Sequence, residues 1–265
     1  MTQPRNLGAF ADNLNSSGQV SLTTGVSGTL PVANGGTGLN ALGTANQVLA
    51  VNSGGTALAF STPSSGFSQA QIFTSSGSFT VPSSGKFKVT IVGGGGSGGS
   101  SNLTGTRAAV GGAGGGTVIK WFTGATPGAT ATVTIGSGGA GQSSAITNGN
   151  AGGNSTFVLS GFSTLTAGGG AGGATSPNGS PSIGGTATNG DVNVAGGYGT
   201  TPVSTEGVGT NRPSLGGSSL FGMGAGNFQP DNSSLSGTGY GSGSSGAGYA
   251  TTSVAGQGGI CIVEY

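Results

Sequence analysis

Apolar and polar residues alternate in several short segments in the second part of the chain. Within residues 86–92, Phe87, Val89 and Ile91 fall on one face of an extended segment and polar residues on the other. This period of two is typical of half-buried strands. The same reasoning predicts strands at 71–74, 78–82, 86–92, 117–122, 131–135, 155–159, 163–167 and 259–265. Apolar spacing of the helical period is missing, so we predict an all-β protein.

The first 65 residues have a different pattern, in which short apolar pairs are separated by small polar residues. Leu30-Pro31-Val32 favours an extended chain, and Asn34-Gly35-Gly36 favours a tight turn. No part of this region could bury a core alone. It is therefore predicted to be an extended, intertwined fibrous segment in which several copies share one apolar axis. A disordered linker is the alternative.

Residues 61–66 read as a linker, which divides the chain into 1–65 and 66–265. Most of the 63 glycines lie in the second region, with tracts at 93–96, 114–116 and 168–173. Residues 168–258 show almost no strand pattern, and so long a loop is usually functional when it is ordered. We expect a β-sandwich-like domain with long glycine-rich loops. These loops would combine extended helices of the polyglycine or polyproline II type with tight turns.

Charged residues make up only 4% of the chain, and there is no histidine. The shortage of Lys and Arg argues against nucleic-acid binding. Without histidine there is no Ser-His-Asp triad and no histidine-bound zinc, and Cys261 stands alone. Asp191 and Glu206 could form a glycosidase pair only if the loops brought them together. We therefore predict no enzymatic activity, no cofactor and no metal site.

Contact with a partner needs few ionisable groups. Tyrosine framed by glycine and serine is typical of recognition loops, since the ring supplies contact area at little entropic cost. Some of these rings could instead pack over glycine backbone and hold the loops together. The receptor-binding candidates are the aromatic and charged residues of the loop region, namely Tyr198, Arg212, Phe221, Phe228, Asp231, Tyr240 and Tyr249.

Two parts of the sequence resemble a known family. Residues 28–38, GTLPVANGGTG, resemble a motif that recurs in the tail fibres of tailed bacteriophages. Residues 73–96 and the closing residues 259–265 are similar to the beginning and end of a glycine-rich domain found at fibre tips. The resemblance implies trimeric shafts, a place at the tip of a fibre and binding to a host receptor.

On this basis we expect a phage tail fibre protein that binds a polysaccharide or an outer-membrane protein of the host. Residues 1–65 would attach to other tail proteins of the virion and form the shaft. A homotrimer is expected, located in the virion and made in the host cytoplasm without a signal peptide, with no nucleic-acid partner and no membrane insertion. The alternative is a purely structural virion component, such as a fibre connector or decoration protein.

Overall fold

The structure is a computed structural model that describes residues 11–12, 14–20, 32, 36–39, 41–63, 66–101, 109–143, 146–175, 180–204, 211–212, 214–226, 233–248 and 252–265. The chain forms two compact units, Met1–Gly66 and Phe67–Tyr265. All named elements are strands, and all their pairings are antiparallel, so the protein is all-β.

The first unit contains one hairpin, formed by β1 (Val48–Val51) and β2 (Leu58–Ser61). Asn52 closes the turn, since its side-chain oxygen accepts a hydrogen bond from the backbone N–H of Thr56 at 2.9 Å. None of the described residues of this unit is buried. The hairpin therefore has no core of its own.

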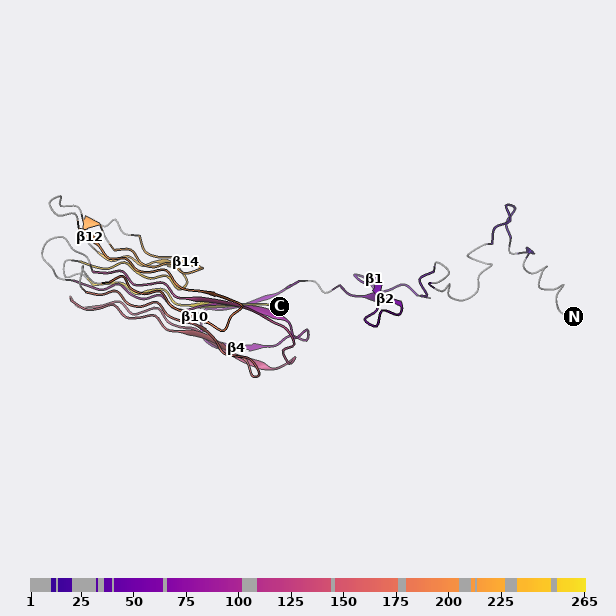
Figure 1. The fold of residues 1–265 in the computed structure, drawn as a ribbon, viewed down its shortest axis with the longest axis horizontal. Helices are drawn as coiled ribbons and strands as arrows, with labels where there is room; N and C mark the ends of the chain where they lie inside the picture. Colours follow the sequence, from indigo (N-terminus) through magenta and orange to yellow (C-terminus); the bar gives the residue numbers. More distant parts are fainter. Residues whose placement is uncertain are drawn as a thin grey trace. The chain divides into compact units, whose positions relative to one another are not determined.

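The second unit contains two five-stranded sheets. The first sheet has the order β11–β6–β5–β16–β3, so its edges are β11 and β3. Its strands are β3 (Ala70–Phe73), β5 (Phe87–Val92), β6 (Thr117–Phe122), β11 (Val192–Val194) and β16 (Ile260–Glu264). The C-terminal strand β16 lies between β5 and β3, which brings the two ends of this unit together (Figure 1).

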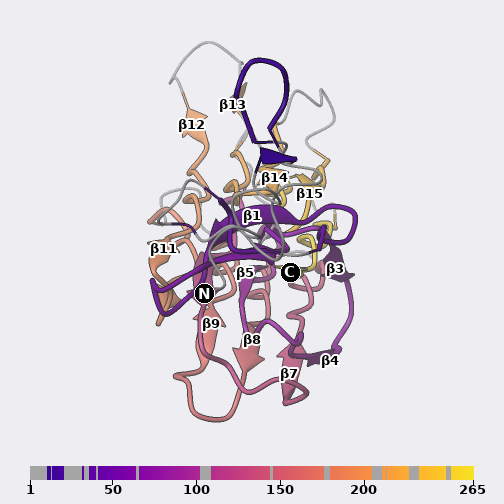
Figure 2. The same ribbon diagram turned by 90° about the vertical axis from the view of Figure 1, so that its right-hand side faces the viewer.

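The second sheet has the order β10–β9–β8–β7–β4. Its strands are β4 (Gly77–Thr80), β7 (Thr130–Thr134), β8 (Ser155–Val158), β9 (Leu165–Ala167) and β10 (Ala187–Thr188). Figure 2 shows β7, β8 and β9 side by side, as this order requires. The eight predicted strands each overlap one of the strands of the two sheets.

The two sheets pack on one hydrophobic core. Phe87 from the first sheet stacks on Phe122 with ring centroids 4.6 Å apart, and Phe157 from the second sheet lies 5.5 Å from Phe122. These rings are at most 2% exposed. Aromatic rings of this size contribute strongly to packing, so the second unit has a substantial core of its own.

Beyond the strands, glycine-rich segments continue as long traces that run side by side (Figure 1). Within residues 93–101 the backbone donors repeat every third residue. The N–H groups of Gly93, Gly96 and Gly99 donate to the carbonyls of residues 116, 113 and 110 at 2.8–3.0 Å. Those of residues 94, 97 and 100 donate to residues 153, 150 and 147 at 2.9 Å. The segment 93–101 thus forms backbone hydrogen bonds to different neighbouring segments through its different sides.

The segment 109–116 repeats this arrangement. Its residues 110, 113 and 116 donate to residues 174, 171 and 168, again in steps of three. A methyl group on Gly115 would overlap the carbonyl oxygen of Gly93, so no larger residue fits there. Glycine is therefore required because the backbones approach so closely, and the hydrogen bonds between backbones take the place of side-chain packing.

The segment 168–258 contains more strand structure than its sequence suggests. Besides β10 and β11, it holds the pairs β12 (Val203–Ser204) with β13 (Asn211–Arg212) and β14 (Gly222–Met223) with β15 (Thr238–Gly239). These strands have two or three residues each, too few to produce a visible alternation, and β11 is added to the edge of the first sheet.

Candidate binding surface

A short hairpin projects apolar side chains from the glycine-rich segments. In β14 and β15, Gly222 pairs with Gly239 and Met223 with Thr238. Phe221 and Tyr240 are the next residues at the ends of these strands, and they are 40% and 39% exposed. Ser219 joins the segment before β14 to the residue after β15 by donating its hydroxyl hydrogen to the carbonyl of Tyr240.

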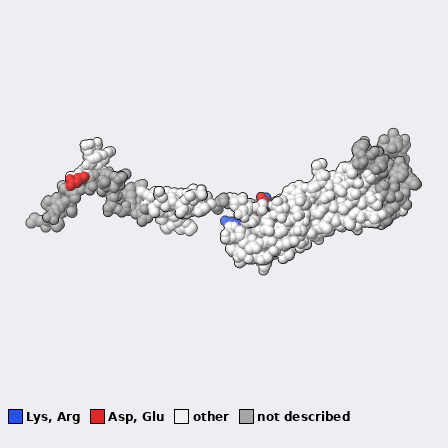
Figure 3. All heavy atoms as spheres, turned by 180° about the vertical axis from the view of Figure 1, so that it is seen from behind, with Lys and Arg blue, Asp and Glu red and all other residues white. Residues whose placement is uncertain are grey.

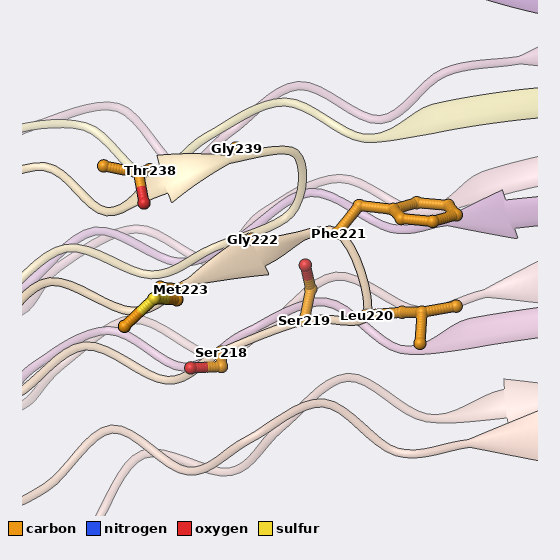
Figure 4. A pocket seen from close by; sticks show the side chains of 8 residues that line it. All are labelled: Ser218, Ser219, Leu220, Phe221, Gly222, Met223, Thr238 and Gly239. Carbon is orange, nitrogen blue, oxygen red and sulfur yellow. The ribbon is translucent and has the colours of Figure 1, made fainter.

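Figure 4 shows the shallow hollow beside this hairpin. It is lined by Ser218, Ser219, Leu220, Phe221, Gly222, Met223, Thr238 and Gly239. Leu220 and Phe221 point to the same side, whereas Met223 lies at the other end of β14. None of the lining residues is charged, so this surface offers apolar contact together with serine and threonine hydroxyls.

Tyr198 lies on a segment next to the one that leads into the hairpin. The N–H of its neighbour Gly197 donates to the carbonyl of Ser218 at 2.7 Å, and the N–H of Gly199 donates to that of Ser182 at 3.1 Å. The tyrosine side chain is 62% exposed. Its backbone is thus fixed by both neighbours while its ring faces solvent.

The structure does not describe the side chains of the other predicted contact residues. Arg212 belongs to β13, where it pairs with Val203, but its side chain lies outside the described residues. Phe228, Asp231 and Tyr249 also lie outside the described residues. The structure therefore brings together Phe221 and Tyr240 on one hairpin, with Tyr198 on an adjoining segment.

Two apolar residues of the hairpin were not among the predicted contacts. Leu220 is 50% exposed and Met223 is 74% exposed. The run Leu220-Phe221-Gly222-Met223 is a concentration of large apolar residues between glycine tracts. That contrast with the flanking sequence was the signal that could have identified them.

The described charged residues of the second unit lie near its strands. Lys88 forms an ion pair with Glu264 at 2.6 Å, and Lys120 forms one with Asp191 at 3.4 Å. On the face shown in Figure 3, the glycine-rich segments show no charged side chain outside the grey residues. The hairpin surface is thus uncharged, and it lies apart from these ion pairs.

The electrostatics of the ionisable groups indicate structural roles. The pKa of Asp191 is lowered because the backbone N–H of Trp121 donates to its carboxylate at 2.8 Å and Lys120 lies beside it. Burial raises the pKa of Cys261 to about 12, so its thiol stays protonated and unreactive at neutral pH. Glu206, the other acid of the possible glycosidase pair, lies outside the described residues.

Among the described residues, no group of three or more His, Cys, Asp or Glu side chains could hold a metal ion. In the same residues, no helix is both long and apolar enough to cross a bilayer.

The sequence of the second unit matches a known domain. The family model of the glycine-rich domain matches residues 73–265, from the end of β3 to the last residue. The chain belongs to this family. The glycine-rich domain thus includes both sheets' main strands and the β14–β15 hairpin. No curated protein matches the sequence.

Proposed function

We propose that this chain is a bacteriophage tail fibre protein that binds a host-cell receptor during adsorption. Residues 1–65 form an extended segment that joins copies of the chain, as a homotrimer, to each other and to other tail proteins. The glycine-rich domain is the tip, and its exposed loops contact a surface polysaccharide or an outer-membrane protein.

The first unit supports the assembly part of this proposal. On β1 and β2, Leu49 faces Phe60 and Val51 faces Leu58, so four large apolar side chains share one face of the hairpin. Leu49 is 44% exposed and Val51 is 64% exposed. An isolated two-stranded hairpin is marginally stable at best. Other copies of the chain would cover this face and supply the missing core.

The hydrogen-bond pattern supports a rigid tip. A repeat of three residues is the period of an extended polyproline II-type helix, which has no internal hydrogen bonds. Segments 93–101 and 109–116 make their bonds to neighbours at this period. We infer that the glycine-rich segments pack as polyglycine helices of this type. Between the packed segments there is room only for small buried side chains such as Ser97 and Ala113, so large side chains are left on the outside, where they can contact a receptor.

The hairpin at Phe221 and Tyr240 carries the binding part of the proposal. Its aromatic and apolar side chains are exposed to solvent, apart from the hydrophobic core of the domain. Exposed aromatic anchors on a fixed backbone are typical of binding surfaces. The absence of charge in the hollow's lining favours stacking on sugar rings or on apolar receptor loops.

Binding of the labelled full chain to cells of the bacterium that the phage infects tests this function. We expect saturable binding, and the substitutions Tyr198→Ala, Phe221→Ala and Tyr240→Ala should each weaken it by roughly five- to thirtyfold, or about 1–2 kcal/mol. Val158→Ala on β8 is the control, since Val158 is similarly exposed at 42% but lies on a strand of the second sheet. Absence of saturable binding would favour the connector or decoration protein instead.

A further inference from the structure

The first sheet has an outer face that no described part of the chain fully covers. By alternation, Phe87, Val89 and Ile91 point into the core, so Lys88 and Thr90 point outward. The strand registers then align one outward residue from each strand in a row across the sheet. This outer row consists of Val192, Ile119, Thr90, Ile262 and Ile72.

The composition of the outer row is unusual for a sheet that faces water. An antiparallel sheet with one solvated face normally places polar residues there. Here four of the five side chains are Val or Ile, with Val192 41% and Ile72 61% exposed. Trp121, two residues beyond Ile119 on the same face of β6, is 47% exposed. This composition is typical of a sheet buried on both faces.

The chain itself already covers one end of this face. Val92 and Ile260, in the row next to the outer row, are 0% and 5% exposed. A Cβ on Gly241 would lie 2.7 Å from Cγ1 of Val92, so the turn after β15 packs on that end. Thr90, in the middle of the outer row, is also buried and is only 4% exposed. The uncovered part of the face is therefore its margin, where Ile72, Val192 and Trp121 are exposed.

The charges on this face point to the nature of its partner. Within the described strands the face carries Lys88 and Glu264, which pair with each other at 2.6 Å. Lys88 also lies over the Trp121 ring at 6.0 Å from its centroid. The face thus has no net charge. The same face of a second copy carries the same lysine and glutamate, so each charge can meet its opposite across a contact between copies. A strongly charged partner would find no matching charge.

We infer that the outer row and Trp121 form a contact between copies of this chain. In the assembly, this face of one glycine-rich domain packs on a neighbouring copy, so that Val192, Ile72 and Trp121 become buried. The Lys88–Glu264 pairs lie at the edge of the contact and fix its register. The tip domains are then joined to one another and not only through the first unit.

The connection between the two units favours this contact. β3, which contributes Ile72, begins at Ala70, four residues after the first unit ends at Gly66. Four residues span at most roughly 14 Å. Copies joined through the first unit would therefore hold their β3 strands at high effective concentration. To this extent the inference rests on the proposed assembly.

The fluorescence of Trp121 provides a direct test, because the chain has a single tryptophan. In the full chain at assembly concentration, we expect Trp121 to be shielded from acrylamide. Ile72→Glu places a charge in the contact, and it should raise the quenching constant by roughly twofold or more as water regains access. Light scattering on the same samples reports whether the copies remain joined through the first unit.

Ile183→Glu is the matched control. Ile183 is 64% exposed, close to the value for Ile72, but it is not part of the sheet face. We expect it to leave the quenching of Trp121 unchanged. If the added charge disturbed folding in general, the quenching of Trp121 would change equally in both variants.

The inference is overturned if Trp121 in the assembled wild-type chain is as accessible as in Ile72→Glu, or if both variants behave alike. It is also overturned if Trp121 becomes shielded only when another virion protein is added, since that protein would then be the occupant. Loss of host-cell binding with an unchanged Trp121 signal would instead count against the proposed function alone.

Discussion

The two units of the chain differ most in what they bury. The second unit has a shared core of aromatic and aliphatic side chains, and rings such as Phe87 and Phe157 are at most 1% exposed. The described residues of the first unit include none that is buried, although its hairpin carries Leu49, Val51 and Phe60. The apolar content of a segment therefore does not show whether it can fold alone.

This difference indicates two ways of reaching a stable structure. In the second unit, the sheets bury side chains while the glycine-rich segments bond backbone to backbone. Buried serine hydroxyls extend this bonding, as where Ser97 accepts from the N–H of Asn150 at 2.8 Å. None of the buried side-chain polar atoms among the described residues lacks a partner. The described residues of the first unit show neither a buried core nor packed glycine backbones, which is why we propose that other copies of the chain stabilise it.

Truncation of a core side chain should give the largest difference in stability effect between the two units. Phe157→Ala removes a ring that contacts Phe79, Phe87 and Phe122, and it should lower the free energy of unfolding of the second unit by about 3–5 kcal/mol. Phe60→Ala in the first unit should leave that unfolding transition unchanged within about 0.5 kcal/mol. Chemical denaturation followed by Trp121 fluorescence, at one fixed protein concentration, measures both.

The Phe60 variant should instead act on assembly. We expect a lower mass by light scattering, because its ring belongs to the apolar face of the first hairpin. A wild-type mass for Phe60→Ala together with unchanged unfolding would show that this face has no partner. The proposal that other copies supply the core that the first unit lacks would then be wrong.

The close approach of glycine backbones gives the next largest effect. Gly115→Ala would place a methyl group on the carbonyl oxygen of Gly93, and separating the segments would strain the bond from Gly115 N–H to Gly241. Such overpacking should cost about 1–3 kcal/mol of unfolding free energy. Gly226→Ala is the control, because there a Cβ meets nothing within 4 Å. Equal stability of the two variants would contradict the packed arrangement.

Much of the strand framework could be predicted from the sequence. Alternation such as that of Phe87, Val89 and Ile91 reports directly which side chains face the core, so eight of the ten strands of the two sheets were identified. The strands β10 to β15 were missed because two or three residues cannot show a period. The register that joins Ile72 with Ile262 was also beyond prediction, since residues 72 and 262 meet only through the order of strands in the sheet.

The candidate surface was predicted only in part. Tyr198, Phe221 and Tyr240 are exposed as a contact role requires, and exposure cannot be read from composition alone. The neighbours of each glycine could not be predicted either, because residues 93, 94 and 95 bond to three different segments. A one-dimensional sequence gives the glycine content but not which backbone lies against which.

The smallest predicted effect concerns the ion pair at the sheet edge. The pKa of Asp191 is lowered by the N–H of Trp121 and by Lys120, so its carboxylate stabilises the folded second unit when it is ionised. This contribution is present above the unfolded pKa and is lost as the pH falls through the lower folded value, below about pH 4. The stability difference between wild type and Asp191→Asn should therefore be constant near neutral pH and shrink in acid. Asp12→Asn makes the same change of charge in the first unit, and a similar pH profile for both variants would assign the effect to net charge instead of to the contacts of Asp191.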